Sequence, residues 1–232
     1  MPETALYRLA GTAKERLTRL LRLHYERGLR DTGGEVSAQE LGFDDPDFFH
    51  YQASAWTALR RALDGRSVTS DDVFLDLGCG KGRVLWLAAR HYPFRRVIGL
   101  EVVEEMADFA RANLEANRHR FRAAEAIVEA GDAARYAIPD DVTFVYMFSP
   151  FGGDVFRAAI GNLVASLDRR PRALSLIYAN PELASVIEDC GRFELVEVLK
   201  PRLRPERRKG AWVNVYETGT ECFVKRPEGS DA

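Results

Sequence analysis

Short apolar runs alternate with longer amphipathic segments along most of the chain. Seven runs are rich in the apolar, β-branched and aromatic residues that favour strands: residues 73–77, 96–101, 126–129, 142–148, 173–178, 193–199 and 211–216. Between several of them, apolar residues recur at helical spacing, over residues 82–90, 106–114, 155–167 and a segment ending near residue 190. This alternation, closed by a final pair of strands, predicts an α/β fold whose sheet is mostly parallel with one antiparallel edge strand.

The first 63 residues have a different pattern. Residues 4–27 carry apolar residues at helical spacing and basic residues around the rest of the helix. An irregular, aromatic-rich segment and a short helix then lead into the first strand. Such a segment can fold back over the carboxyl edge of the sheet, where ligands bind in open α/β folds. We therefore predict a helical extension and lid over residues 1–63, with Tyr51 and His50 as lid residues, and one domain over residues 64–226. The alternative for these aromatic residues is a set of core plugs beneath a connecting loop.

Glycine occupies every second position in the turn after the first strand. The sequence there is Val-Phe-Leu-Asp-Leu-Gly-Cys-Gly-Lys-Gly-Arg, residues 73–83. A strand, a glycine turn and a helix in this order form the first crossover of nucleotide-binding α/β folds, where the backbone must approach the ligand closely. Position 83 is Arg, so the Gly-x-Gly-x-x-Gly pattern of dinucleotide sites is not completed. This difference argues against an NAD-type cofactor.

A second acidic residue ends the next strand. Glu101 lies about 20 residues after Gly80, the offset at which an acid meets the ribose hydroxyls in such folds. A carboxylate suits that task because it accepts two hydrogen bonds from a vicinal diol. The alternative is an acid favoured by the dipole of the helix that follows.

The stretch from Asp76 to Gly82 resembles the first motif of class I S-adenosylmethionine (SAM) dependent methyltransferases. The resemblance implies a three-layer, Rossmann-like fold with a seven-stranded sheet, and SAM as cofactor with S-adenosylhomocysteine as product. It also implies that Asp132 and the Ala133 backbone reach the adenine, although Gly-Asp is also ordinary turn chemistry. The cofactor-binding residues that we expect are Asp76, Gly78, Cys79, Gly80, Glu101, Asp132, Ala133 and Ser149. Two roles are open for Asp76: its charge lies near the sulfonium and the amino acid part of SAM, or its carboxylate holds the backbone N–H groups of the glycine loop.

The segment Ser149-Pro150-Phe151 follows the fourth strand. It resembles the Asn/Asp-Pro-Pro/Phe-aromatic motif that orients the target nitrogen in some amino methyltransferases, but its first residue is Ser. A serine hydroxyl both donates and accepts, and it cannot copy an Asn amide. The catalytic residues that we expect are Tyr51, Ser149 and Pro150, and His50, Tyr51 and Tyr178 are the candidates for a general base.

The likeness covers roughly residues 30–220. Asp31-Thr32, residues 51–54, the glycine strand and Asn180-Pro181 resemble a group of small bacterial class I methyltransferases of unassigned substrate. A weaker likeness, an aromatic segment ahead of the first motif plus the Pro-Phe pair, points to non-SET protein lysine methyltransferases.

Composition and charge limit the partners. The 232 residues have a formal net charge of −2, which gives no global electrostatic case for nucleic acid. Three widely spaced cysteines form no metal or disulfide pattern. No apolar run approaches the ~20 residues of a membrane span and no secretory signal is recognisable, so we expect a cytoplasmic protein. The basic residues 200–209 favour an acidic substrate or form a solvated hairpin. The 4–27 helix presents either a basic face to an acidic partner or membrane surface, or a solvated face while it docks on the core or on a second subunit in a homodimer.

The sequence therefore predicts a SAM-dependent methyltransferase that acts on a nitrogen or oxygen nucleophile of a small molecule or a protein side chain. One alternative is a SAM-binding scaffold or sensor without catalysis, favoured by Ser149 in the acceptor motif. The second alternative is an NAD(P)-dependent oxidoreductase.

Overall fold

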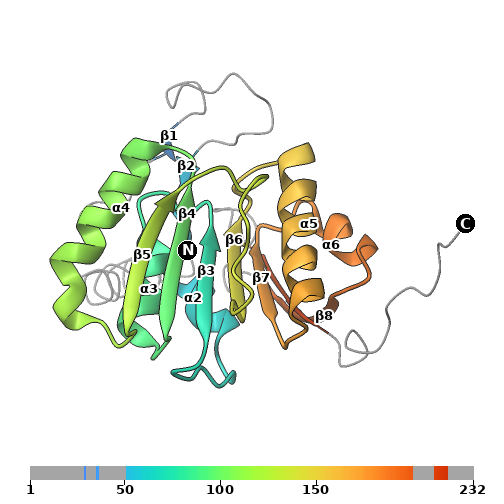
Figure 1. The fold of residues 1–232 in the computed structure, drawn as a ribbon, viewed down its shortest axis with the longest axis horizontal. Helices are drawn as coiled ribbons and strands as arrows, with labels where there is room; N and C mark the ends of the chain where they lie inside the picture. Colours follow the sequence, from blue (N-terminus) through green and yellow to red (C-terminus); the bar gives the residue numbers. More distant parts are fainter. Residues whose placement is uncertain (1–28, 30–34, 37–50, 201–211, 219–232) are drawn as a thin grey trace, which may run out of the picture.

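A computed structural model describes residues 29, 35–36, 51–200 and 212–218 (Figure 1). The strands are β1 (Glu35–Val36), β2 (Tyr51–Gln52), β3 (Val73–Leu77), β4 (Arg96–Glu101), β5 (Glu125–Ala130), β6 (Phe144–Phe148), β7 (Ser175–Ala179), β8 (Glu194–Leu199) and β9 (Val213–Glu217). The α-helices are α2 (Trp56–Ala62), α3 (Arg83–His91), α4 (Glu104–Asn117), α5 (Gly153–Arg169) and α6 (Ala184–Asp189), and Arg118–Arg120 form a short 3-10 helix.

Seven strands form one sheet in the order β5-β4-β3-β6-β7-β9-β8. All neighbours from β5 to β7 pair in parallel, whereas β9 is antiparallel to both β7 and β8. The predicted α/β fold class, with its mostly parallel seven-stranded sheet, is therefore confirmed. The antiparallel strand β9 lies one position in from the edge, because β8 runs parallel to β3–β7 and takes the edge itself.

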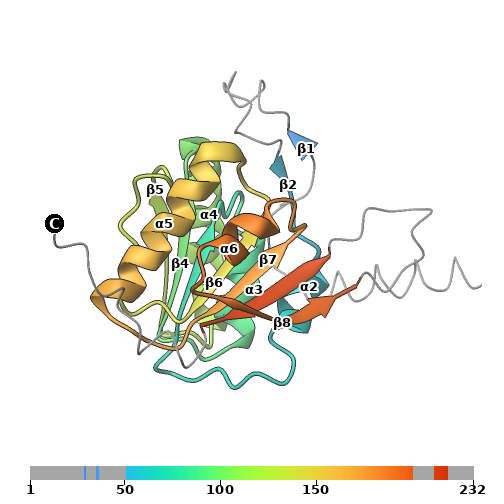
Figure 2. The same ribbon diagram turned by 90° about the vertical axis from the view of Figure 1, so that its right-hand side faces the viewer.

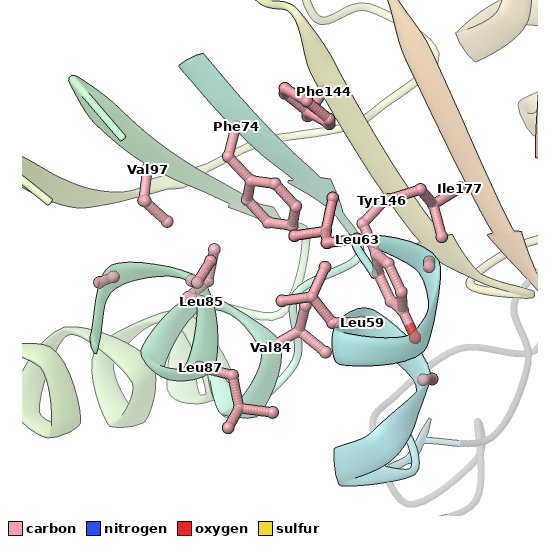
Figure 3. Close-up of a cluster of buried hydrophobic side chains, with 14 of the residues drawn as sticks. Leu59, Leu63, Phe74, Val84, Leu85, Leu87, Val97, Phe144, Tyr146 and Ile177 are labelled. Carbon is pink, nitrogen blue, oxygen red and sulfur yellow. The ribbon is translucent and has the colours of Figure 1, made fainter. Parts of the chain in front are cut away.

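Helices cover both faces of the sheet and make three layers (Figure 2). One core cluster joins α2 and α3 to the sheet through side chains such as Leu59, Leu85 and Phe74 (Figure 3). A second cluster joins α5 and α6 to the opposite face through Leu75, Phe156 and Ile187. Successive residues of a strand point to opposite faces, and β3 is buried along its whole length. A strand that is buried on both faces is expected to be apolar along nearly its whole length, and Asp76 is the charged exception in β3.

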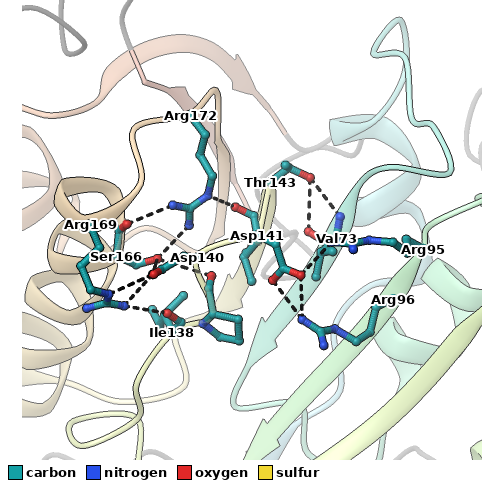
Figure 4. Close-up of polar contacts among 12 residues, drawn as sticks. Val73, Arg95, Arg96, Ile138, Asp140, Asp141, Thr143, Ser166, Arg169 and Arg172 are labelled. Carbon is teal, nitrogen blue, oxygen red and sulfur yellow. Dashed lines mark hydrogen bonds and ion pairs between the residues drawn. The ribbon is translucent and has the colours of Figure 1, made fainter.

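Ion pairs hold the amino-terminal ends of the strands together (Figure 4). The Asp141 carboxylate accepts hydrogen bonds from Arg95 at 2.7 Å and from Arg96 at 2.9 Å. Asp140 accepts hydrogen bonds from Arg169 of α5 at 2.7 and 3.0 Å. This network lies at the edge opposite to the carboxyl ends of the strands, so it anchors the fold away from the ligand-binding edge.

The short β1–β2 hairpin lies beyond the carboxyl ends of the central strands (Figure 1). Its register pairs Val36 with Tyr51. The α2 helix that follows packs into the first core cluster, so the end of the predicted extension is integrated with the sheet. Residues 4–27, the segment around His50 and residues 201–209 lie outside the described residues, and the boundary at residue 63 stays a prediction. In the described part of the chain, no helix is both long and apolar enough to cross a membrane.

Candidate functional site

A pocket opens at the carboxyl ends of β3, β4, β5 and β6. The loops that follow these strands line it, together with residues 52–54 and the first turns of α3, α4 and α5. The lining residues are Gln52, Ala53, Ser54, Gly78, Cys79, Gly80, Arg83, Val84, Leu100, Glu101, Val102, Val103, Met106, Gly131, Asp132, Ala133, Phe148, Ser149, Pro150, Phe151 and Val155. Four strand ends that are far apart in the sequence therefore contribute to one cavity.

The glycine loop after β3 is held against β4 by its backbone. The N–H groups of Gly78 and Cys79 both donate to the Leu100 carbonyl, at 2.9 and 3.0 Å. Gly78 has φ +76°, and a Cβ added there would lie 2.3 Å from the Cβ of Pro150. Only glycine satisfies both the left-handed backbone and this close approach. The absence of a side chain thus lets the loop after β6 lie directly on the glycine loop.

Glu101 ties the glycine loop to the start of α4. One carboxylate oxygen accepts a hydrogen bond from the Gly80 N–H at 2.7 Å, and the other accepts one from the Val103 N–H at 3.1 Å. The side chain is buried, and burial raises the pKa of Glu101, while these backbone donors lower it in part. A carboxylate offers about four acceptor sites, so two bonds leave room for a further donor. The sequence left open that Glu101 is an acid favoured by the dipole of the following helix. Its bond to the N–H of Val103 at the start of α4 fits that alternative, and Glu101 lines the pocket as well.

Asp76 is a buried carboxylate beneath the glycine loop, with 3% of its surface exposed. Among the described residues, none donates a hydrogen bond to it, because the loop N–H groups are directed to Leu100 and Glu101. Burial raises the pKa of Asp76 well above its usual range, and the nearby charge of Glu101 raises it further. Asp76 therefore does not hold the loop backbone, which was one of its two expected roles. It is an acceptor that still needs a donor.

Cys79 lines the pocket with a buried thiol. Its Sγ packs on β4, where a Cβ added to Gly99 would lie 2.8 Å from the sulfur. Burial raises the pKa of Cys79, and the charges of Asp76 and Glu101 add to this effect. A protonated, packed thiol is a poor nucleophile, so the part of Cys79 at this site is its backbone and its packing.

The loop after β5 closes the far side of the pocket. The Asp132 carboxylate accepts a hydrogen bond from the Ala134 N–H at 2.9 Å, which is the turn chemistry considered as the alternative for this residue. The amide of Asn162 in α5 donates to the carbonyls of Ala133 and Ala134, at 3.1 and 3.0 Å. These bonds fix the loop, and both Asp132 and Ala133 remain part of the pocket lining.

Ser149 follows β6 in a left-handed backbone conformation, with φ +34°. Its hydroxyl donates to the main-chain carbonyl of Asn180 at the end of β7, and it accepts a hydrogen bond from the Asn180 side-chain amide at 3.3 Å. Tyr178 lies beside this pair, and its hydroxyl accepts a hydrogen bond from the Leu183 N–H. Burial raises the pKa of Tyr178, so this tyrosine is a poor general base.

Most residues that line the pocket lie in a part of the chain that matches a known family of domains. A family model described as "Methyltransferase domain" matches residues 74–170. That range runs from β3, through the glycine loop and Glu101, to the end of α5, and it includes the segment that follows β6. Residues 74–170 form a class I methyltransferase domain. The strand order and the single antiparallel strand agree with this identification.

Relatives of this methyltransferase domain differ in their acceptors. The chain is 39% identical to a protein-lysine N-methyltransferase of Saccharolobus islandicus over 59 residues, which are 25% of this chain and 37% of that relative. The matched part is thus little more than a third of the curated relative. An RNA methyltransferase of Salinibacter ruber, solved with S-adenosyl-L-homocysteine, superimposes with a TM-score of 0.51 at 20% identity, over 78% of this chain and 99% of that one. A SAM-dependent methyltransferase of Methanosarcina mazei superimposes with a TM-score of 0.53 at 16% identity, over 72% and 99% of the two chains. At these identities, the solved structures show a shared fold alone.

Most of the residues predicted for the site meet in the pocket of the methyltransferase domain. Those that line it are Gly78, Cys79, Gly80, Glu101, Asp132, Ala133, Ser149 and Pro150. Asp76 lies buried behind them. Tyr51 precedes Gln52 in β2, close in sequence to the pocket lining, but its side chain is outside the described part of the structure. The roles of these residues stay predictions.

Some lining residues were missed by sequence reasoning. Arg83 was considered only because it replaces a glycine of the dinucleotide pattern, yet it lines the methyltransferase pocket and donates to the Ser54 carbonyl at 3.0 Å. This bond ties the first turn of α3 to the segment before α2. Asn180 was noted only as part of a family likeness. No pattern in the sequence indicates that these residues meet segments about 30 positions away.

Proposed function

We propose that the chain is an enzyme that transfers a methyl group from SAM to a nucleophile of a protein side chain. The observation that carries the proposal is the convergence of the glycine loop, Glu101, Asp132 and Ser149 on one pocket of a methyltransferase domain. Each is a type of residue that suits a different part of SAM, and each comes from a different strand end.

The residues of the pocket fit this cofactor. Asp76 lacks a hydrogen-bond donor among the described residues, and the ammonium of the methionine part of SAM would supply one. Gly78 and Gly80 leave the backbone open to close approach. The spare acceptor sites of Glu101 match the ribose hydroxyls. Asp132 and the Ala133 backbone would receive the adenine, beside the apolar side chains of the pocket such as Val102.

Methyl transfer asks the protein mainly for positioning and for exclusion of water. The lone pair of the acceptor nitrogen or oxygen forms the new bond to the methyl carbon, and the electron pair of the broken carbon–sulfur bond stays on sulfur. The products are neutral S-adenosylhomocysteine and a methylated acceptor, and the net reaction releases one proton to water. Ser149 and Pro150, at the end of β6, would orient the acceptor, and Tyr51 would close the pocket from the β1–β2 hairpin.

A protein acceptor is favoured over a small metabolite by the similarity to the protein-lysine N-methyltransferase. This partial match does not distinguish a nitrogen from an oxygen nucleophile.

Two measurements test the proposal. Calorimetry should show binding of SAM and S-adenosylhomocysteine without binding of NAD, and binding of NAD alone would refute it in favour of the oxidoreductase. The purified protein is then incubated with methyl-tritiated SAM and a proteome extract, and the acid-precipitated and acid-soluble fractions are counted. Label in the precipitated protein is expected. Label confined to the soluble fraction would contradict the protein acceptor, and binding of SAM with no transfer to either fraction would favour the scaffold.

A further inference from the structure

Two residues with left-handed backbone conformations lie side by side at the carboxyl ends of β6 and β7, and the first of them, Ser149, lines the pocket. Ser149 has φ +34° and Asn180 has φ +53°, and among the described residues these are the non-glycine positions with positive φ. They follow the neighbouring parallel strands β6 and β7 and are hydrogen-bonded to each other. Strained backbone of this kind tends to be retained where it positions functional groups.

The hydrogen bonds fix the orientation of the Asn180 side chain. Its amide nitrogen donates to Glu182 Oε1 at 2.8 Å and to Ser149 Oγ at 3.3 Å. A carboxylate oxygen can only accept, so the nitrogen of the amide must face Glu182. Both amide hydrogens are therefore used, and the amide oxygen of Asn180 has no hydrogen bond among the described residues.

The side-chain groups of this cluster that have no hydrogen bond among the described residues are all acceptors. The Ser149 hydroxyl donates to the Asn180 carbonyl, and its Oγ accepts a hydrogen bond from the Asn180 amide and lies beside the Tyr178 hydroxyl. Asn180 presents its amide oxygen, and the exposed Glu182 presents its second carboxylate oxygen. The patch formed by Ser149, Asn180 and Glu182 thus offers acceptors and one negative charge, and its hydrogens are already bonded.

We propose that this patch recognises the acceptor as a primary ammonium group. An ammonium has three donors and no acceptor, so it complements a patch of acceptors that carries negative charge. An alcohol supplies only one donor and brings acceptor lone pairs of its own. This assignment rests on the proposed function, and it adds Asn180 and Glu182 to the site as binding residues for the substrate. The bound ammonium releases one proton to water, and the neutral amine then attacks the methyl carbon as described above.

The test uses two probes that differ only in the ammonium group. Nα-acetyl-lysine methylamide and Nα-acetyl-norleucine methylamide are titrated into the protein saturated with S-adenosylhomocysteine, at pH 7 and low salt, and binding is followed by NMR chemical shifts. The lysine probe is expected to bind about tenfold more tightly than the norleucine probe, a ratio in the range of a charge-assisted hydrogen bond.

Two variants test whether Glu182 and Asn180 cause the preference for the lysine probe over the norleucine probe. Glu182→Gln should reduce the ratio between the two probes about twofold to fivefold, the scale of an exposed charge pair. Asn180→Gly should reduce it about threefold to tenfold, and glycine tolerates the left-handed backbone, so the fold is spared. Asp189→Asn removes the same charge from an exposed position at the end of α6 and should leave the ratio unchanged.

The affinity for S-adenosylhomocysteine is measured in every variant and should stay within twofold of the original, about the error of the comparison. Equal binding of the two probes, or a full preference retained in both Glu182→Gln and Asn180→Gly, would overturn the ammonium assignment while leaving the cofactor site standing. Failure of the unaltered protein to bind S-adenosylhomocysteine would instead refute the proposed function and this inference with it.

Discussion

Replacing Asp76 by Asn should make the protein more stable and its cofactor binding weaker. Asp76 is 3% exposed, and burial together with the charge of Glu101 raises its pKa well above the usual range. A charge held in this way opposes folding. If its counterpart is the ammonium of SAM, the same charge stabilises the complex. The Asp76→Asn change keeps the size of the side chain and removes only the charge.

The magnitudes follow from the surroundings of Asp76. Loss of a charge-assisted hydrogen bond should weaken SAM binding by about 1–3 kcal/mol, a factor of roughly 5 to 150. Relief of the buried charge should stabilise the ligand-free protein by about 1 kcal/mol. For a chain of this size, that gain corresponds to a rise in the thermal midpoint of about 2–4 °C.

The contribution of Asp76 to the stability of the folded protein should decrease as the pH rises. Because the pKa of Asp76 is raised in the folded protein, the folded state holds a proton that the unfolded chain has already released. The contribution of Asp76 to stability therefore becomes less favourable as the pH rises from the unfolded pKa, about 3.9, through the higher folded pKa. The advantage of Asp76→Asn should be largest at neutral pH and should disappear near pH 4.

Calorimetry with SAM and thermal unfolding between pH 4 and 8 measure the two effects. Asp71→Asn is the matched control, because Asp71 is exposed just before the opposite end of the same strand. It should change neither quantity. A lower thermal midpoint in Asp76→Asn would refute the view of Asp76 as an uncompensated buried charge, and unchanged SAM affinity would refute its place in the cofactor site.

Three further changes probe the same pocket. Glu101→Ala should weaken SAM binding by about 1–3 kcal/mol and, unlike Asp76→Asn, lower the thermal midpoint, because two backbone N–H groups lose their acceptor; a higher midpoint would contradict this. Gly78→Ala should abolish detectable SAM binding, since the new Cβ would lie 2.3 Å from Pro150, whereas Gly65→Ala, which has a similar φ and open space, should bind normally. Tyr178→Phe should leave the pH profile of methyl transfer unchanged, because the raised pKa makes this hydroxyl a poor base; a shifted profile would give it a role in proton transfer.

Local patterns were enough to locate the strands and helices of the domain. The strands over residues 73–77 and 96–101 were predicted with their observed bounds, and the other strands of the seven-stranded sheet lie within a few residues of their predicted ends. Continuous apolar runs and helical spacing are local consequences of burial, so they can be read along the chain. The glycine loop is equally local, because its positive φ angles require glycine wherever the loop lies.

Local sequence patterns could not predict the contacts between segments that are distant along the chain. The sequence left Asp76 with two roles, and the directions of the Gly78 and Gly80 N–H groups, toward β4, decided against one of them. The insertion of β9 between β7 and β8 depends on sheet pairing, which local periodicity does not encode. The pairing of Ser149 with Asn180 depends on the adjacency of β6 and β7 in the sheet.

The sequence by itself therefore determined the class of fold, the place of the cofactor loop and the strand ends at which a ligand would bind. The tertiary structure decided which groups at those ends already have partners and which do not. The reason is physical: burial and turn geometry are properties of short segments, whereas hydrogen-bond saturation depends on every segment that packs nearby. Asp76, Asn180 and Glu182 stand out only after those neighbours are known.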